Sequence, residues 1–348
     1  MLFISWNGKQ KPVFLCKNNY KESKGDKGFM HEIGGYFEME TFHGKEYHMG
    51  AYAFDSGRNA LAALVKARQY KNVYLPDFSC DSIADGIRKG GAKVRYYSVD
   101  ANLQPVFSST LAPEDALLVV NYYGQLTNEI LAAYAKKYAR VIIDNTQAFF
   151  QAPLPHVDTT YSCRKFFGVA DGGYLYTDAA IEGYEVDVSA KRMLFVLGRY
   201  DEDASTYYQE ASQNNEIFSD KPIQIMSKLT HNLLRAIDYD AAARKRQHNA
   251  AYLHSHLKRI NKMQVQVPYG AFMYPLMVNS SIGGGQLRKI LQQSKIYVPC
   301  LWSDTLCRTS TDTMAYQLAE NIVPLPCDQR YDIEDMDYIL EKIYETVK

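Results

Sequence analysis

The 348-residue sequence lacks the marks of a membrane or secreted protein. No apolar run approaches the roughly 18 residues that a membrane-spanning helix needs. The opening residues, MLFISWNGKQKP, lack the basic segment and apolar run of a secretory leader, and the six cysteines include no Cys-x-x-Cys pair. We therefore expect a soluble, reduced, cytoplasmic protein that has no membrane partner.

An excess of one charge and a cluster of metal ligands are also missing. The 39 Lys and Arg residues cancel the 39 Asp and Glu residues, so the basic excess typical of nucleic-acid-binding proteins is absent. Of the eight histidines only His254 and His256 are closely spaced, and at that spacing two side chains on a helix point to different faces. We predict neither a nucleic-acid partner nor a metal site.

Between residues 50 and 180 the sequence alternates short β-rich runs with amphipathic stretches. This alternation is typical of an α/β fold in which a mainly parallel sheet lies between helices. Strands are expected at VYLPDF, VRYYSVD, ALLVVNYY, RVIIDNT and GYLYTD. Longer helical segments are expected around residues 201–216 and 222–257.

The chain length favours two domains. We place a large domain at residues 1–240 and a small C-terminal α+β domain at residues 241–348. In the small domain we expect a helix through ARKRQHNAAYLHSHLKRI and a last helix at EDMDYILEKIYETV. Strand-like pieces between them are MQVQVPYG, FMYPLMV and KIYVPCL.

Three short segments carry residues with chemical potential. Asp144 follows the apolar run of residues 141–143 and ends an expected buried strand, which is where open α/β sheets bind ligands. Lys165 precedes two phenylalanines, which predicts a partly buried side chain. Ser56 and Gly57 precede a helix, whose free N–H groups attract an anion. Taken singly, these are an ordinary capping carboxylate, surface lysine and capping turn.

Together the three segments fit one cofactor, pyridoxal 5'-phosphate (PLP). PLP needs a lysine that takes up its aldehyde as a Schiff base, a carboxylate that keeps its pyridine nitrogen protonated, and a helix terminus for its phosphate. Lys165, Asp144 and the turn at Ser56 and Gly57 supply these groups. The sequence therefore predicts a PLP-binding protein.

The same segments resemble the DegT/DnrJ/EryC1/StrS family of sugar aminotransferases, which are fold type I PLP enzymes. DSGRNAL is similar to the family's SGTAAL phosphate turn, and VVNYYGQLTNEILAAYAKKYARVIIDNTQAFF to its segment around the ring-binding carboxylate. Two glycines follow the family's lysine by seven and eight residues, as Gly172 and Gly173 follow Lys165 here. The likeness covers residues 30–180 best, and ENIVPLPCDQRYDIEDMDYILEKI resembles the family's C-terminal ending.

Carried over by position, the resemblance implies a set of cofactor contacts. Lys165 would form the Schiff base and act as the catalytic base, and Asp144 would pair with the pyridine nitrogen. Gln147 would contact a ring substituent. The remaining cofactor-binding positions, all expected around the phosphate, are Gly57, Arg58, Asn59 and Ser162.

Departures from the family pattern leave some positions open. Arg58 stands where the family has a hydroxyl, which would make this phosphate contact charge-assisted. Ser162 lies three residues before the lysine rather than five, and Arg164 is an alternative phosphate contact. Two further positions lack a clear counterpart: the ring-stacking aromatic, at Cys80 by alignment with Phe78 nearby, and the cross-subunit asparagine, Asn214 or Asn215.

The resemblance implies a homodimeric PLP-dependent aminotransferase of amino-sugar and polysaccharide biosynthesis. Glutamate or glutamine would be the amino donor, and a keto-sugar, free or nucleotide-linked, the acceptor. Two alternatives stay open: another PLP-dependent reaction, such as dehydration, decarboxylation or retro-aldol cleavage, and a non-catalytic relative that keeps the fold for binding or assembly. The first is motivated by residues 190–240, which differ most from the family's substrate-binding segment.

Overall fold

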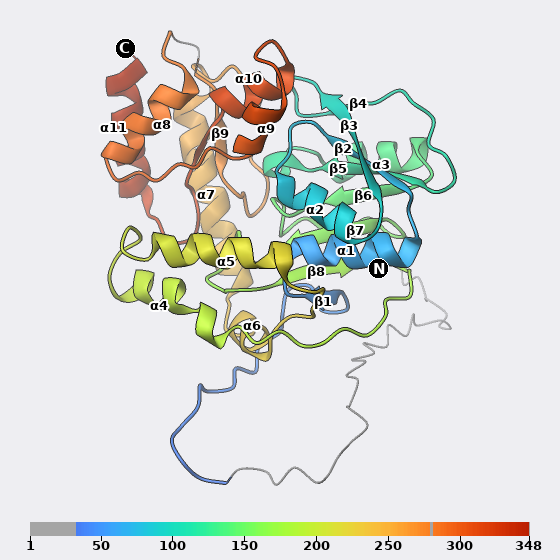
Figure 1. The fold of residues 1–348 in the computed structure, drawn as a ribbon. Helices are drawn as coiled ribbons and strands as arrows, with labels where there is room; N and C mark the ends of the chain where they lie inside the picture. Colours follow the sequence, from blue (N-terminus) through green and yellow to red (C-terminus); the bar gives the residue numbers. More distant parts are fainter. Residues whose placement is uncertain (1–32, 279–280, 348) are drawn as a thin grey trace, which may run out of the picture.

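The computed structural model describes residues 33–278 and 281–347, which form a large sheet-based part and a smaller C-terminal part (Figure 1). The main sheet has the strand order β1-β8-β7-β6-β5-β2-β3-β4. Pairing is parallel from β3 through β2, β5 and β6 to β7, whereas β8, β1 and β4 are antiparallel to their neighbours. The mainly parallel α/β architecture expected from the sequence is confirmed. The strands are β1 (Tyr52–Phe54), β2 (Asn72–Pro76), β3 (Lys93–Val99), β4 (Pro105–Val106), β5 (Asp115–Val120), β6 (Val141–Asp144), β7 (Asp158–Ser162) and β8 (Gly173–Tyr176).

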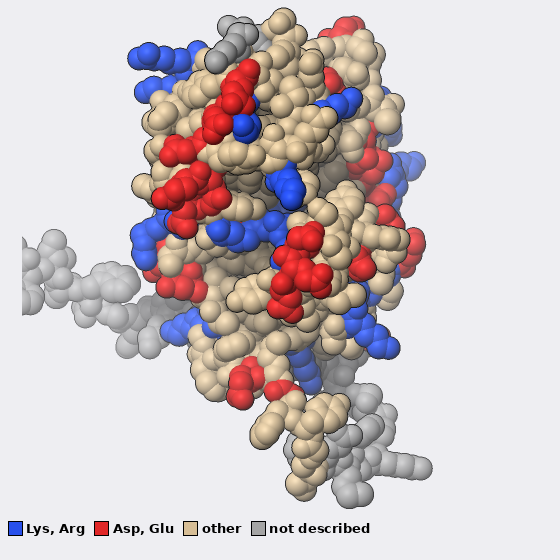
Figure 2. Space-filling model, turned by 90° about the vertical axis from the view of Figure 1, so that its left-hand side faces the viewer, with Lys and Arg blue, Asp and Glu red and all other residues tan. Residues whose placement is uncertain are grey.

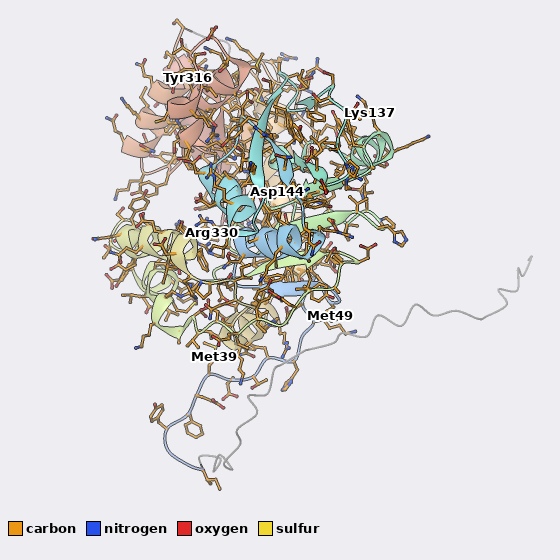
Figure 3. The ribbon with its side chains drawn as sticks, turned by 45° about the vertical axis from the view of Figure 1, so that its right-hand side comes forward. Met39, Met49, Lys137, Asp144, Tyr316 and Arg330 are labelled. Carbon is orange, nitrogen blue, oxygen red and sulfur yellow. The ribbon has the colours of Figure 1, made fainter. Side chains whose placement is uncertain are left out.

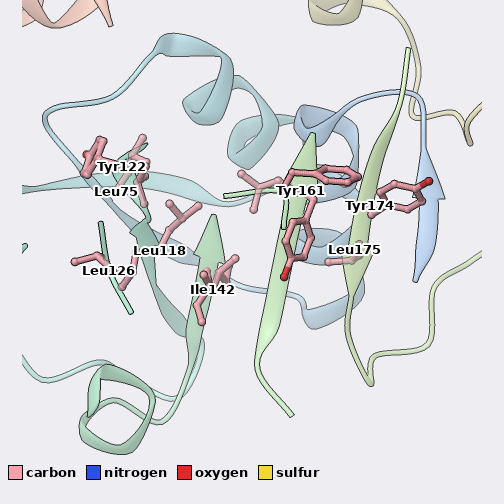
Figure 4. Packing of buried hydrophobic residues seen from close by; sticks show 14 of the residues in the cluster. Leu75, Leu118, Tyr122, Leu126, Ile142, Tyr161, Tyr174 and Leu175 are labelled. Atoms are coloured by element: carbon pink, nitrogen blue, oxygen red, sulfur yellow. The ribbon is translucent and has the colours of Figure 1, made fainter. Parts of the chain in front are cut away.

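The central strands read as continuous apolar runs because helices cover both faces of the sheet. Every residue of β5 (DALLVV) and β6 (VIID) is buried, as is typical of parallel strands between helix layers. Leu75, Leu118, Ile142 and Leu175 come from four strands and follow one another across the sheet (Figure 4). Because this apolar layer holds the strands together, it also fixes where their carboxyl ends lie relative to one another.

Three helices of the large part cover the two faces of the main sheet. α1 (Gly57–Arg68) and α2 (Asp81–Lys89) pack together over one face, and α3 (Asn128–Lys137) lies on the other (Figures 1 and 4). α1 begins at Gly57 because the side chain of Ser56 accepts a hydrogen bond from the Asn59 N–H at 3.2 Å. The first turn of α1 therefore lies against the start of β8.

Helix α7 (Tyr239–Leu257) joins the large part to the C-terminal part. Its first half contributes Ala242 and Ala243 to the main core, and its second half contributes Leu253 and Leu257 to a separate core. The domain boundary at residue 240 therefore stays a prediction, since one continuous helix belongs to both cores. The second core also contains the antiparallel pair β9 (Tyr274–Leu276) and β10 (Val323–Leu325) with α8 (Gly284–Gln293) and α11 (Ile333–Val347).

Between α8 and β10 the chain returns to the main core. Trp302, Leu318 and Ile322 are buried in that core although they lie far along the sequence. They belong to, or flank, the short helices α9 (Ser303–Arg308) and α10 (Met314–Asn321). The C-terminal part thus packs onto the ends of the main-sheet strands. None of the helices in the described ranges is long and apolar enough to cross a membrane.

Two groups of sequence expectations are wrong in detail. The helical segments expected at residues 201–216 and 222–257 divide into α4 (Leu194–Asp201), α5 (Tyr208–Asp220), α6 (Lys228–Leu234) and α7. A turn in which Asp203 accepts from the N–H groups of Ser205 and Thr206 separates α4 from α5. The pieces MQVQVPYG and KIYVPCL form no strand, because neither segment finds a strand to pair with in the described ranges.

Buried His48 makes the fold sensitive to acid. The ring is 3% exposed and lies within hydrogen-bond distance of the Phe149 carbonyl (2.9 Å) and the Tyr176 hydroxyl (3.2 Å). Burial lowers its pKa from 6.5 to about 4. Because the unfolded chain takes up the proton first, the neutral ring contributes stability above pH 6.5 that is lost as the pH falls toward 4.

We expect acidification from pH 7 to pH 5 to cost about 2 kcal/mol of unfolding free energy through His48 alone. His48→Gln keeps an amide that can donate to the Phe149 carbonyl but does not titrate. Urea unfolding of both proteins at the two pH values measures the difference. An equal loss of stability in His48→Gln and the parent protein would show that other groups carry the pH dependence.

Candidate active site

The carboxyl ends of four parallel strands and the start of α1 surround a cavity of about 300 Å³. Cys80 lies just beyond β2, Val120 ends β5, Asp144 ends β6 and Ser162 ends β7, and all four line the cavity. Parallel strands present their carboxyl ends at one edge, so residues distant in sequence converge there. Asp144 lies near the centre of the molecule (Figure 3).

Lys165 and Asp144 face the same space and are connected through Thr146. The Lys165 Nζ donates to Thr146 Oγ1 at 3.2 Å, and the Thr146 N–H donates to Asp144 Oδ1 at 2.9 Å. Asp144 is only 4% exposed, whereas Lys165 is exposed. The predicted partial burial of Lys165 is wrong because Phe166 and Phe167 enter the core and leave the lysine at the cavity. An accessible amine therefore stands near a buried carboxylate.

The segment that carries Lys165 is held in place by the C-terminal part. Arg246 Nη2 and Gln329 Nε2 both donate to the carbonyl oxygen of Phe166, at 3.1 and 2.9 Å. The Arg246 guanidinium also lies over the Phe166 ring, 4.6 Å from its centroid. Burial lowers the pKa of Arg246 to about 10, and the Asp328 carboxylate acts in the opposite direction. These contacts fix the backbone one residue beyond the lysine.

The other end of the cavity is basic. The first N–H groups of α1 have no intrahelical acceptor and carry its positive dipole end. Arg58 and Arg164 line the same space; Arg58 donates to Ser219, and Arg164 to Asn215. In the described chain, the Nε atoms of both arginines are buried without a hydrogen-bond partner. Two guanidinium groups at a helix N-terminus, each with a free donor, are suited to an anion.

The electrostatics of Arg164 reflect this crowding of positive charge. Burial lowers its pKa to about 10, and the neighbouring guanidinium groups of Arg192 and Arg58 add to the effect. The Phe218 ring lies 4.7 Å from the Arg164 guanidinium and covers it. Figure 2 shows basic side chains across a hollow in the middle of one face, with acidic side chains to either side. A bound anion would relieve the repulsion between the arginines.

The two glycines after Lys165 have different structural roles. Gly172 has a φ of +122°, which favours glycine, and its N–H donates to the Asp55 carbonyl at 2.6 Å. A Cβ on Gly173 would lie 2.5 Å from the backbone nitrogen of Gly57 and 2.5 Å from the carbonyl carbon of Ser56. Gly173 therefore lets β8 approach the α1 turn so that the turn reaches the cavity.

Gly173→Ala is expected to destabilise the protein by about 1 to 3 kcal/mol, because the contact is with backbone and overpacking costs that much. Gly283→Ala is the matched control, since its Cβ would meet nothing nearer than the Asn321 side chain at 3.8 Å. Urea unfolding of both variants measures the difference. Equal stability of the two variants would contradict the close approach.

The structure brings most predicted site residues together. Gln147 is buried, and its Oε1 accepts from the Tyr123 N–H at 2.8 Å. Asn59 is the exception: its side chain is fully buried away from the cavity and donates to Asp55. The Asn59 side chain is therefore committed to Asp55, and a contact between a phosphate and the turn that contains Asn59 stays a prediction. The predicted residues that line the cavity are Gly57, Arg58, Asp144, Gln147, Ser162 and Lys165.

Sequence reasoning missed other lining residues. Thr146, between Asp144 and Gln147, could have been found from its place in the same strand-end segment. Phe218 and Trp302 also line the cavity, but no local pattern connects them to it. Of the two asparagine candidates, Asn215 lines the cavity of its own chain, whereas Asn214 bonds Arg192 and the Ala170 carbonyl.

Comparisons with known proteins place the fold. Neither a family model nor a curated protein matches the sequence. Solved structures do match: a DegT DnrJ EryC1 StrS aminotransferase from Brucella abortus has a TM-score of 0.59 at 15% identity, over 85% of this chain and 86% of that one. The sugar aminotransferase CalS13 from Micromonospora echinospora has a TM-score of 0.55 at 15% identity, over 84% and 86%.

A third similar structure is described as a dehydratase. It is the E. coli GDP-4-keto-6-deoxy-D-mannose-3-dehydratase with bound hydrated PLP, with a TM-score of 0.57 at 17% identity, over 86% of this chain and 87% of that one. The chain therefore has the fold of the sugar aminotransferases and of this dehydratase. The resemblance predicted from the sequence is confirmed at the level of the fold, and identities of 15–17% mark the chain as divergent.

Proposed function

We propose that the cavity binds PLP and that the protein is a PLP-dependent aminotransferase. The observation that carries the proposal is the convergence of Lys165, Asp144 and the Arg58–Arg164 pair on one cavity. These residues fit the group: an accessible amine suits an aldehyde, a buried carboxylate suits a pyridine nitrogen, and unpartnered guanidinium donors suit a phosphate. Bound PLP would supply an electron-withdrawing ring.

The chain's own residues would divide the work as follows. Lys165 Nζ would hold the aldehyde covalently and, once freed by the amino donor, move a proton at the substrate carbon as general base. Asp144 Oδ2 would keep the proton on the ring nitrogen, while its Oδ1 accepts from the Thr146 N–H. Gln147, held through its Oε1, would place its amide against a ring substituent. Arg58 and Arg164, with Ser162 and the Gly57 turn, would bind the phosphate.

The finer assignment is amino transfer from glutamate or glutamine to a keto-sugar, free or nucleotide-linked. Support comes from the fold neighbours that are described as sugar aminotransferases. The dehydratase neighbour, which acts on a GDP-linked keto-sugar, motivates the second candidate, a PLP-dependent dehydration in the same cavity. Amino transfer leaves a new amino group on the sugar, whereas dehydration removes water from it, so analysis of the sugar product separates the two reactions.

The test is an absorbance spectrum of the purified protein with PLP, before and after borohydride, with a panel of amino donors. We expect a band of lysine-bound cofactor that borohydride fixes to the Lys165 peptide and that glutamate or glutamine bleaches. A band that no donor changes would favour a PLP reaction that consumes no amino donor, such as decarboxylation or retro-aldol cleavage. Absence of the band would overturn the cofactor assignment and return the protein to a non-catalytic role.

We also propose that the protein is a cytoplasmic homodimer. Three apolar side chains on one face of α4, Leu194, Leu197 and Tyr200, are each more than half exposed. α4 packs on α5, which contributes Asn215 and Phe218 to the cavity, so a second copy on α4 would lie close to the site. Light scattering should find a dimer, and Leu197→Glu should shift it toward monomer; a parent protein that is monomeric would contradict the proposal.

A further inference from the structure

The cavity has an aromatic wall that comes from the C-terminal part. Trp302 lines the cavity together with Cys80, although some 220 residues separate them in the sequence. By the resemblance to the family, the ring-stacking aromatic would fall at Cys80, and a thiol offers no such face. Phe78, the other candidate, is fully buried behind the cavity lining.

Trp302 is held rigidly from behind. Its indole packs on Phe78, Tyr122 and Tyr123, with ring centroids 4.5, 5.2 and 5.7 Å apart. These three rings belong to the segments that follow β2 and β5, so they set the indole against the strand ends. Only 8% of Trp302 is exposed, and it also lines the cavity. The indole is therefore fixed by packing at the cavity wall.

The helix that follows Trp302 is tied to the same strand end. Thr305 Oγ1 donates to the carbonyl of Ser79 at 3.2 Å, and Arg308 Nη2 donates to it at 2.6 Å. The Asp304 carboxylate accepts from the Asp81 N–H at 2.9 Å. These contacts bracket Cys80 on both sides. They therefore fix the position of Trp302 relative to Cys80.

The backbone of Trp302 has a left-handed conformation, which is uncommon for a bulky residue. Its φ is 59° and its ψ is 39°. Such a conformation persists only where the surroundings enforce it, and it is concentrated at binding sites. Here it turns the chain from the 295–301 segment into α9 with the indole at the cavity.

We propose that Trp302 supplies the aromatic face for the pyridine ring of the cofactor, in place of the residue at Cys80. The inference rests on the proposed PLP site. Stacking needs a flat apolar surface held in a fixed orientation, and the packing of Trp302 on three aromatic rings provides one. The ring would then lie within reach of Asp144 and Gln147, which line the same cavity.

The test is titration of the full-length protein with PLP, following the absorbance and circular dichroism of the bound cofactor. Trp302→Leu should weaken binding about tenfold and reduce the circular dichroism of the band, whereas Trp302→Phe should bind within about threefold of the parent. The double variant Trp302→Leu, Cys80→Phe should restore binding, because the aromatic returns to the position where the family has it. Far-ultraviolet circular dichroism checks that each variant is folded.

The outcomes separate this inference from the PLP site itself. If Trp302→Leu is folded and binds PLP as the parent does, Trp302 does not stack on the ring, although the proposed cofactor stands. If binding falls but neither Trp302→Phe nor the Cys80→Phe rescue restores it, the loss is a packing defect and the inference fails. A parent protein without a bound-cofactor band overturns both proposals.

Discussion

Replacing Lys165 with alanine should abolish covalent attachment of PLP and slow amino transfer by about 100- to 10,000-fold or more. Proton transfer by one positioned group contributes a factor of about 100 to 10,000 to the rate. Loss of the covalent link to the cofactor slows the reaction further. The stability of the fold should change by less than about 0.5 kcal/mol, because Lys165 is exposed and its side-chain hydrogen bond, to the Thr146 hydroxyl, lies at the surface of the cavity. Absorbance after borohydride and single-turnover rates with glutamate measure the two effects.

Two variants sharpen this prediction. Lys165→Arg keeps a positive charge near Thr146 but cannot form the covalent link, so it should behave like Lys165→Ala in the reaction. Lys137→Ala removes a lysine of α3 at the edge of the molecule (Figure 3) and should leave spectrum and rate unchanged. A band in Lys165→Ala that borohydride still fixes to the protein would assign the attachment to another lysine.

Replacing Asp144 with asparagine should slow the reaction by about 100- to 1,000-fold while PLP still binds. Asparagine keeps an oxygen that can accept from the Thr146 N–H, so the loss reports the missing negative charge. One preorganised electrostatic contact at a reacting group is worth a factor of that size. The rate at which glutamate bleaches the cofactor band, measured by stopped flow, gives the effect on chemistry separately from the effect on binding.

The matched control is Asp158→Asn, a second buried carboxylate of the same sheet. Asp158 lies at the start of β7 and pairs with Arg68 at 2.8 and 3.0 Å, away from the cavity. Its loss should destabilise the fold and leave the rate of the folded protein unchanged. If Asp144→Asn reacts within threefold of the parent, the carboxylate is not the partner of the ring nitrogen.

Much of the candidate site could be predicted from local sequence. Asp144 follows an apolar run, and such a run ends at the ligand-binding edge of a parallel sheet. Lys165 and the two glycines lie within nine residues of one another, so their spacing is read directly from the sequence. The turn at Gly57 is a local capping structure. Each of these signals depends on neighbours in the chain, which the sequence displays directly.

The expectations that the structure corrects also depended on local sequence, which does not show what a side chain or a segment packs against. A motif position also does not reveal which way a side chain turns: that of Asn59 turns inward and donates to the buried Asp55 carboxylate. The burial of Lys165 was overestimated because its phenylalanine neighbours occupy the core themselves. The hydrophobic pattern of residues 263–270 and 295–301 predicted strands, but those segments find no strand partner.

The sequence by itself determined the α/β architecture, the strand that ends at Asp144, the capping turn at Gly57 and the spacing of Lys165 from Gly172 and Gly173. Only the tertiary structure decided that Arg164 and Arg58 stand together at the cavity and that Trp302 reaches its wall. The first set depends on hydrogen bonding and apolar periodicity over a few residues. The second depends on packing between distant segments, where the burial of aromatic surface sets positions that no spacing along the chain encodes.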